Sequence, residues 1–502
     1  MRHPPAPKRG VLPPVMLDRR AATSLGAQIA QALREAIRSG HMQDGARLPP
    51  SRNAAEQLGV GRNAVVDAYD ELLAEGLVET RGRLGSFVSS GTRTPHHPSP
   101  TSAPTREADA LSKPGQDWRL GQTSIQLLPL HIWRTACREA GRHLPPSDYG
   151  DPRGVLGLRE AIAEWLLRER GIAYDTRQIV LTQGAGAAID ALAKLLIKPG
   201  DVCAVESPGY TMATLAMERA GAKLVKVPVD SRGIDVDLAF QHPPKLIHLT
   251  PGHQYPMGGR LSSQRRQDLV RLILRHGGYL IENEYDHEFI LDGHNHAPVA
   301  ASLPENTILV STFAKAISPS LRVGFIAAPR VIADTLTQDI NQSQQHVSWP
   351  VQVSLQWLLR SGEMRRHLRR VHRHFTDLRQ QLLHAIARDC PGLQVLSHEG
   401  GPHVVLTAGQ AQPDDLLAQC IRQRGVILQT LRDFGGEQPT PLMGYGHMGK
   451  ADLASAATLL AAAWADAQRL SASRPPPQAQ PGTELSAHIS GSHSRAGPTS
   501  TS

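Results

Sequence analysis

Residues suited to binding an anion and to attacking a carbonyl carbon occur at two places in the central part of the chain. Gly184-Ala185-Gly186 opens a predicted helix, where small residues, free N–H groups and the helix dipole favour a phosphate. Lys315 carries an amine that can form a Schiff base with an aldehyde. Thr312 and Arg322 flank this lysine with a hydroxyl and a cationic fork that can bind the same phosphate. Each feature alone is weak, because lysines are usually solvated and small-residue turns usually serve packing.

Basic residues at three places near the N-terminus are suited to contacting a nucleic acid. Ser51 can cap a helix, and Arg52 then projects beside the positive end of that helix toward a phosphate. Gly61-Arg62-Asn63 opens the next predicted helix, where small residues let the backbone approach a groove and Arg or Asn can reach base edges. Arg81-Gly82-Arg83 forms the tip of a predicted hairpin, which suits a minor-groove or phosphate contact. Any one of these arginines alone can equally be a solvated surface residue.

The elements that would position the basic residues are three helices and a hairpin. Apolar residues recur every four positions from Leu25 to Ile37, Ser24 can cap that helix, and Gly40 can end it. The predicted order is a helix over 25–37, helices over 52–58 and 63–75, and strands over 77–80 and 86–88. A hairpin that follows a helix–turn–helix is the layout of a winged helix–turn–helix domain.

The elements around Gly184 and Lys315 alternate between strands and helices. Short apolar runs predict six strands, over 180–181, 202–205, 224–227, 246–249, 279–282 and 308–311. Helices over 187–197 and 263–276 separate some of them, and long amphipathic helices dominate beyond Val351. We therefore predict an α/β domain with a mostly parallel, doubly wound sheet and a smaller C-terminal α+β subdomain.

Composition divides the chain into four parts. Two stretches rich in Ser, Pro and other polar residues cannot bury enough apolar surface to offset the entropy of ordering them. We therefore predict an N-terminal domain over 1–90, a flexible linker over 91–115, a second domain over 116–470 and a disordered tail over 471–502.

Charge, cysteines and hydropathy limit the functional classes. The net charge of +8, from 54 Lys and Arg against 46 Asp and Glu, permits an anionic partner without proving one. The four cysteines form no C-x-x-C pair, so neither a zinc site nor a disulfide framework is expected. No apolar run reaches the roughly 18–20 residues of a membrane span, and the N-terminus lacks the apolar core of a signal peptide. We expect a cytoplasmic protein without a metal or membrane contact.

Both halves of the chain resemble known families. The run from RLPPSRNAAEQLGVGRN to RGRLGSFV, over 47–88, resembles the winged-helix domain of the GntR superfamily. The segment 118–470 resembles a fold-type-I, pyridoxal-phosphate-dependent aminotransferase. Six motifs occur in family order: YGDPRGVLGLREAIAEWL, LTQGAGAAIDAL, VESPGYTM, TPGHQYPMG, IENEYDHEF and STFAKAISPSLRVGF. The combination resembles the MocR/GabR-type transcription regulators.

The second resemblance implies a pocket for pyridoxal 5′-phosphate. It implies that Lys315 forms the Schiff base with the cofactor aldehyde, Tyr210 stacks on the ring, and Tyr285 offers its phenol to the 3′-oxygen. Asn283 would lie at the ring nitrogen. The residues implied in holding the phosphate are Gly184, Ala185, Gly186, Thr312 and Arg322.

The first resemblance implies binding to double-stranded DNA, at an operator with repeated half-sites. The residues implied in DNA contact are Arg52, Gly61, Arg62, Asn63, Arg81 and Gly82. Family members place each cofactor near the boundary between two subunits, so we expect a homodimer in the bacterial cytoplasm. An amino compound is a candidate effector in addition to the cofactor.

Four features depart from the aminotransferase pattern. Asn283 replaces the aspartate that usually pairs with the ring nitrogen, and an amide cannot keep that nitrogen protonated as a carboxylate does. The lost charge-assisted bond is worth roughly 1.5–3 kcal/mol, and Glu284 can substitute only if the backbone shifts. The stretch 439–449 lacks the arginine that usually holds a substrate carboxylate. Met212 stands where some of these regulators carry arginine, and Ala314 replaces a serine that the family often has before the lysine.

These departures favour a regulator that senses pyridoxal phosphate or an amino compound. The first alternative is an active aminotransferase with an accessory DNA-binding extension. The second is a degenerate domain that binds no cofactor and serves only to dimerise. The presence of Lys315 counts against this alternative, and the presence of Asn283 counts for it. An absorbance scan distinguishes the three, because a Schiff base absorbs in the violet and its decay with amino acids would reveal turnover.

Overall fold

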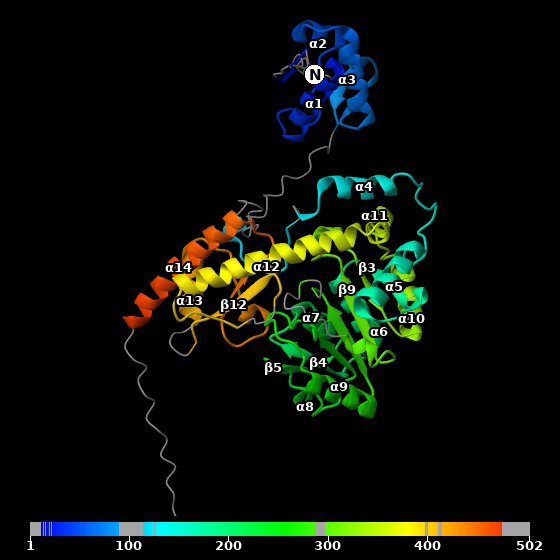
Figure 1. The fold of residues 1–502 in the computed structure, drawn as a ribbon. Helices are drawn as coiled ribbons and strands as arrows, with labels where there is room; N and C mark the ends of the chain where they lie inside the picture. Colours follow the sequence, from blue (N-terminus) through cyan, green and yellow to red (C-terminus); the bar gives the residue numbers. More distant parts are fainter. Residues whose placement is uncertain are drawn as a thin grey trace, which may run out of the picture. The chain divides into compact units, whose positions relative to one another are not determined.

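The computed structural model divides the chain into two compact units, residues 1–110 and 111–502 (Figure 1). It describes residues 12–13, 15, 17–19, 21, 23–89, 114–124, 127–286, 289, 297–396, 400–409 and 414–473. The predicted linker, 91–115, lies outside the described residues except for its last two. The predicted tail, 471–502, also lies outside them except for its first three residues, and the last helix among the described residues continues to Ala472.

The N-terminal unit is a small helical domain with a two-stranded hairpin. Its elements are α1 (Leu25–Arg38), α2 (Ser51–Leu58), α3 (Arg62–Ala74), β1 (Val78–Thr80) and β2 (Ser86–Val88). Ser24 caps α1, as predicted, by accepting a hydrogen bond from the backbone N–H of Ala27 at 3.2 Å. Leu33 of α1 and Val65 and Leu72 of α3 are buried in one core, and β1 pairs antiparallel with β2. The predicted winged helix–turn–helix is confirmed.

The second unit is built on an eight-stranded, mostly parallel sheet (Figure 1). Its strands are β3 (Ile179–Thr182), β4 (Val202–Ser207), β5 (Lys223–Asp230), β6 (Gly233–Ile234), β7 (Leu246–Leu249), β8 (Tyr279–Glu284), β9 (Thr307–Thr312) and β10 (Gly324–Ala327). Their order is β3-β10-β9-β8-β7-β4-β5-β6, and β10 runs antiparallel to both of its neighbours. All six predicted strands are present, whereas β6 and β10 were not predicted.

Helices cover both faces of this sheet. One face carries α6 (Ala185–Leu196), α7 (Thr211–Arg219) and α10 (Arg330–Ser343). The other carries α4 (Leu130–Ala140), α5 (Leu156–Arg170), α8 (Val236–Ala239), α9 (Ser263–His276) and α11 (Trp349–Arg360). Alternate strand residues face opposite layers, so Ile281 and Val310 pack toward α6 while Leu280 and Leu309 pack on the other face. No helix among the described residues is long and apolar enough to cross a membrane.

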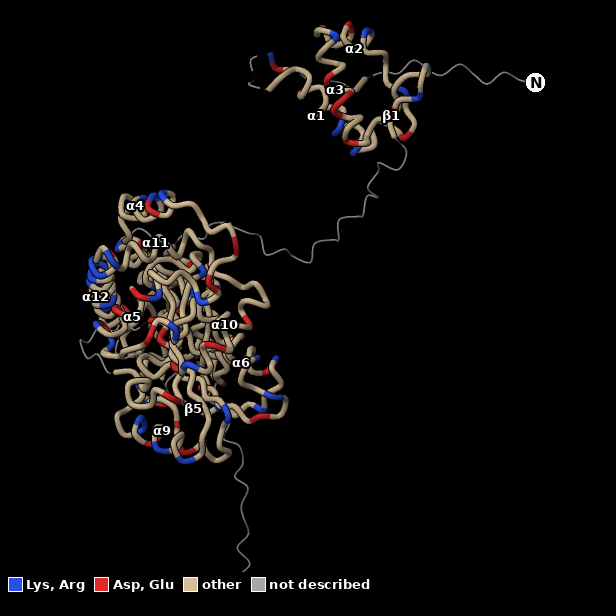
Figure 2. The backbone as a smooth tube through the Cα atoms, turned by 90° about the vertical axis from the view of Figure 1, so that its right-hand side faces the viewer, with Lys and Arg blue, Asp and Glu red and all other residues tan. Residues whose placement is uncertain are grey.

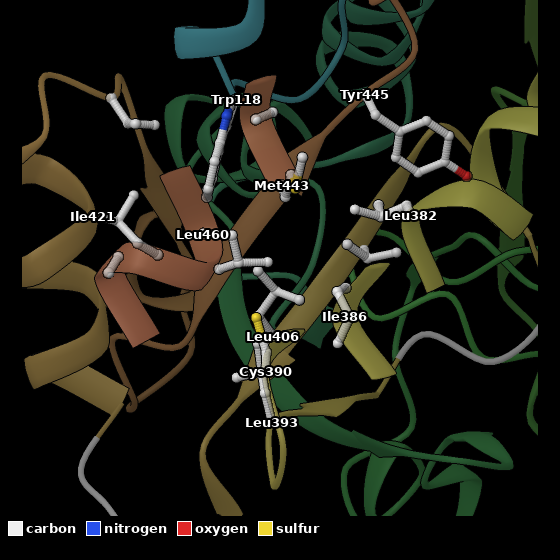
Figure 3. Packing of buried hydrophobic residues seen from close by; sticks show 14 of the residues in the cluster. Trp118, Leu382, Ile386, Cys390, Leu393, Leu406, Ile421, Met443, Tyr445 and Leu460 are labelled. Atoms are coloured by element: carbon white, nitrogen blue, oxygen red, sulfur yellow. The ribbon is translucent and has the colours of Figure 1, made fainter. Parts of the chain in front are cut away.

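A smaller C-terminal subdomain joins four antiparallel strands to long helices. Its elements are α12 (Glu363–Asp389), β11 (Gln394–Val395), β12 (His403–Thr407), α13 (Asp414–Gln423), β13 (Gln429–Thr430), β14 (Pro441–Gly444) and α14 (Lys450–Ala472). Figure 3 shows its core, in which Leu382 and Ile386 of α12, Leu406 of β12 and Leu460 of α14 share one buried cluster with Trp118. The sheet order is β11-β12-β14-β13. The predicted α+β subdomain is confirmed.

Lysine and arginine residues gather along α12, as Figure 2 shows. Part of this charge is compensated within the unit. Arg365 pairs with Glu169 at 2.9 Å, and Arg366 pairs with Glu363 at 2.7 Å. These arginines remain about half exposed, so the ion pairs stabilise the fold little.

Candidate functional site

One pocket contains every residue to which the sequence analysis gave a cofactor role. These nine residues are Gly184, Ala185, Gly186, Tyr210, Asn283, Tyr285, Thr312, Lys315 and Arg322. The rest of the lining is Tyr255, Ala314, Pro319 and Val323. The pocket therefore draws on the start of α6 and on residues at or just beyond the C-terminal ends of β8 and β9. Because these two parallel strands are neighbours, their C-terminal ends meet at one edge of the sheet.

One end of the pocket is shaped for an anion. Gly184 precedes the first residue of α6 with a φ of 90°, and the first N–H groups of that helix have no intrahelical partner. A Cβ added to Gly184 would lie 3.7 Å from the guanidinium carbon of Arg322. Arg322 itself is one of the two non-glycine residues at positive φ among the described residues. Thr312 is buried, and its hydroxyl donates to the carbonyl oxygen of Val323 at 3.2 Å.

Lys315 is a buried amine in this pocket. Burial lowers the pKa of Lys315 from 10.5 to about 8, because the charged amine loses its hydration, and Asp286 opposes part of that change. A Cβ added to Gly121 would lie 3.1 Å from the lysine Nζ, so a side chain there would crowd the amine. A lysine that is neutral in part near pH 8 suits nucleophilic attack on an aldehyde.

Three tyrosines form the aromatic wall. Tyr210 stacks on His248 with ring centroids 6.0 Å apart and an interplanar angle of 25°. Tyr255 meets both Tyr210 and Tyr285 edge to face, at 5.9 and 5.2 Å. Sequence reasoning missed Tyr255, although it lies in the TPGHQYPMG motif. Its aromatic side chain in that loop was the signal that could have found it.

The phenol of Tyr285 belongs to a buried polar cluster. Its oxygen lies 3.0 Å from Nδ1 of His253, and the same nitrogen lies 2.7 Å from a carboxylate oxygen of Asp286. Burial and the nearby Asp286 charge raise the pKa of Tyr285 well above its usual value. The phenol therefore stays protonated at neutral pH. Its predicted contact with the cofactor 3′-oxygen remains a prediction.

Asn283 lines the same pocket and has one unsatisfied atom. Its Nδ2 lies 3.3 Å from Nε2 of His248, whereas its Oδ1 is buried and has no hydrogen-bond partner among the described residues. Glu284 could take its place only after a backbone shift, and the regular strand β8 shows none. Glu284 points to the other face of β8 and is held there by Arg170, whose Nε donates to it at 3.1 Å. Strand alternation is the physical reason.

The pocket residues fit pyridoxal 5′-phosphate. A cation and the free N–H groups of a helix start lie together, and a buried lysine, an aromatic wall and a side chain with an unsatisfied acceptor line the same pocket. An unpaired buried acceptor costs roughly 1–3 kcal/mol, which a hydrogen bond from a ligand would recover.

The six residues predicted to contact DNA are all exposed on the N-terminal unit. They are Arg52, Gly61, Arg62, Asn63, Arg81 and Gly82. Nε of Arg62 donates to Oγ of Ser51 at 3.3 Å, which brings the starts of α2 and α3 together. Ser51 is the first residue of α2 and makes no capping hydrogen bond, so the expected cap was wrong. Arg81 pairs with Glu79 and lies 4.9 Å above the Phe87 ring.

The two units define a class of protein in which a winged-helix DNA reader is joined to an aminotransferase-like domain. Residues 25–88 match the family described as bacterial regulatory proteins, gntR family, and residues 119–440 match aminotransferase class I and II. The chain belongs to the MocR/GabR type of helix–turn–helix transcriptional regulators. The predicted cofactor, pyridoxal 5′-phosphate, is confirmed at the level of this family.

Sequence similarity to two known regulators extends over both units, and a solved aminotransferase shares the fold over a smaller part of the chain. The chain is 31% identical over 463 residues to a probable rhizopine catabolism regulatory protein, MocR, of Rhizobium meliloti, covering 86% of this chain and 92% of that protein. It is 32% identical over 427 residues to the HTH-type pyridoxine biosynthesis transcriptional regulator PdxR of Corynebacterium glutamicum, covering 84% and 91%. The fold resembles LysN, an α-aminoadipate aminotransferase of Thermus thermophilus, with a TM-score of 0.65 and 23% identity over 71% of this chain and 94% of that one.

Proposed function

We propose that occupancy of the pocket controls DNA binding by this regulator. The observation that carries the proposal is that a lysine-containing pocket and an exposed basic surface belong to the two units of one chain. Pyridoxal 5′-phosphate, alone or with an amino compound, is the ligand of the pocket. Double-stranded DNA with repeated half-sites is the ligand of the basic surface. A homodimer in the bacterial cytoplasm presents two winged-helix units to such a site.

Each pocket residue has a defined task under this proposal. The bound cofactor supplies an aldehyde that condenses with an amine and a ring that withdraws electrons. Lys315 provides the amine. The start of α6 and Arg322 would hold the phosphate, with Thr312 beside them, because N–H groups and a guanidinium fork both donate to phosphate oxygens. Tyr210 would offer an aromatic face to the ring, and Tyr285 would offer its phenol to the 3′-oxygen.

Footprinting of the full-length protein on DNA upstream of its own gene tests the proposal. Protection is measured with and without pyridoxal 5′-phosphate, and then with a series of amino acids and simple amines. We expect a violet absorbance band from the loaded protein and at least a several-fold change in DNA affinity with one of the ligands. Equal affinity under all these conditions would contradict control by the pocket.

An active aminotransferase is the second candidate, and the complete lysine pocket favours it. Among the pocket's lining residues the only cations are Lys315 and Arg322, and Arg322 lies at the anion end. No lining cation is left to hold a substrate carboxylate, which favours sensing. Multiple-turnover transamination by the wild-type protein would instead favour the active aminotransferase over the sensor.

A further inference from the structure

The two polar atoms of the Asn283 side chain have different surroundings. Nδ2 lies 3.3 Å from Nε2 of His248 on the neighbouring strand β7. Oδ1 is buried, has no partner among the described residues, and belongs to a side chain that lines the pocket. When the NH2 group of an amide donates to a neighbour on one side, the amide oxygen faces the other side and can accept a hydrogen bond from a group there.

His248 is built to accept this hydrogen bond. It lies on the same face of the sheet as Asn283, is 1% exposed and stacks on Tyr210. Burial lowers the pKa of His248 to about 4, so the ring is neutral at physiological pH and carries one proton. Because Nε2 faces the N–H groups of the Asn283 amide, the hydrogen bond between them requires that proton to lie on Nδ1. Nε2, the nitrogen that faces Asn283, is left as the acceptor.

We propose that His248 is a positioning residue that turns the amide oxygen of Asn283 toward the ring nitrogen of bound pyridoxal 5′-phosphate. This inference rests on the proposed function. An oxygen acceptor at this point pairs with a protonated ring nitrogen and repels the lone pair of an unprotonated one. An amide turned the other way would donate to the lone pair and favour the unprotonated ring.

The proposal predicts an order for the pKa of the ring nitrogen. A full carboxylate stabilises the pyridinium most, a carbonyl oxygen less, and an amide N–H not at all. The ring nitrogen in the wild-type protein therefore titrates at a pKa between those of two variants. Asn283→Asp raises it. His248→Phe lowers it, because the phenyl ring keeps the packing against Tyr210 but leaves the amide free to turn.

The experiment follows the ¹⁵N chemical shift of ring-labelled pyridoxal 5′-phosphate in the full-length protein as a function of pH. We expect His248→Phe to lower the pKa of the ring nitrogen by about one pH unit, the size expected for one hydrogen bond to a charged group. The matched control is His403→Phe. His403 is also a buried histidine near the aromatic wall, but its Nε2 bonds to the carbonyl oxygen of Pro256 and not to Asn283. This control should leave the pKa unchanged. An unchanged pKa in His248→Phe would overturn the proposal.

A wild-type measurement covers the case in which His248→Phe does not fold. In protein labelled at its histidine ring nitrogens, the signal of His248 is the one that responds to Asn283→Asp. We expect its Nε2 to be unprotonated, and a protonated Nε2 would overturn the proposal. Failure of the proposed function looks different, because DNA affinity would then be the same with and without pyridoxal 5′-phosphate, while the pKa of the ring nitrogen could still be measured.

Discussion

Burial of the Lys315 amine disfavours its charged form, and its pKa falls from 10.5 to about 8 for that reason. Only the neutral amine attacks an aldehyde, so capture of pyridoxal 5′-phosphate by the cofactor-free protein should accelerate as the pH rises through about 8. A surface lysine would show the same rise nearer 10.5. Stopped-flow absorbance between pH 6.5 and 10 measures this profile, and a midpoint near 10 would contradict a buried nucleophile.

Replacing the lysine tests its chemistry directly. Lys315→Ala should lose the violet band, and borohydride should no longer fix the cofactor to the chain, because the amine is gone. Lys194→Ala is the control, since Lys194 is a largely exposed lysine paired with Asp190. Absorbance and intact mass after borohydride treatment give the two readings. If borohydride still fixes the cofactor to Lys315→Ala, the amine that reacts with the cofactor belongs to another residue.

We expect the Asn283 side chain to limit the chemistry of the loaded pocket. Asn283→Asp places a carboxylate at the ring nitrogen, which favours the pyridinium and stabilises negative charge developing on the substrate. We expect a faster half-reaction with amino acids, measured as the decay of the violet band in single-turnover mixing. The gain should stay small, because the lining offers no further cation for a substrate carboxylate. An unchanged rate would show that the amide is not the limiting feature.

At the scale of elements, the starts of α2 and α3 form the surface that we expect to read DNA. Arg62→Ala should abolish specific operator binding and leave the cofactor spectrum intact, because one good base contact is worth about 1–3 kcal/mol. Arg38→Ala is the matched control, an exposed arginine in the last turn of α1, outside the six predicted contact residues. Footprinting at constant salt compares the two. Full protection by Arg62→Ala would remove Arg62 from the recognition surface.

Local signals were enough to predict most elements. Apolar runs found the six strands, and the Ser24 cap and Gly40 bracketed α1. Strand β10 was missed because no α-helix separates it from β9, only the short 3-10 turn Pro319–Leu321, and because its antiparallel pairing depends on the whole sheet. The Ser51 cap failed because α2 begins at Ser51 itself, one residue earlier than expected.

The pocket residues that stand in recognisable sequence motifs could be predicted, and the residues whose roles depend on tertiary contacts could not. All nine residues with a predicted cofactor role lie together, since each stands in a motif with its own local signal. His248 and the His253–Asp286 pair were not found, because their roles arise from contacts between strands and loops far apart in sequence. The orientation of Glu284 follows from strand alternation alone, since the alternation of β8 separates it from Asn283.

At the scale of the whole molecule, an exposed apolar segment supports the predicted homodimer. Every residue from 141 to 151 is exposed, although the segment includes Leu144, at 93%, and Tyr149, at 71%. Exposed apolar residues gathered in one segment are typical of a surface that a partner covers. We expect the full-length protein to sediment as a dimer at micromolar concentration, and a monomer under those conditions would refute the homodimer.

The same segment gives a variant that should weaken the dimer. Leu144→Asp places a charge where the interface would bury a leucine. Loss of that burial, about 1.5–3 kcal/mol, should raise the dissociation constant at least tenfold. Leu274→Asp is the control, because Leu274 is 66% exposed on α9, away from this segment. Sedimentation equilibrium over a range of concentrations measures both.

If DNA reading requires two winged-helix units, Leu144→Asp should also lose affinity for the operator at concentrations where it is monomeric, while its violet band persists. A dissociated variant that still binds the operator with full affinity would show that each chain reads DNA alone.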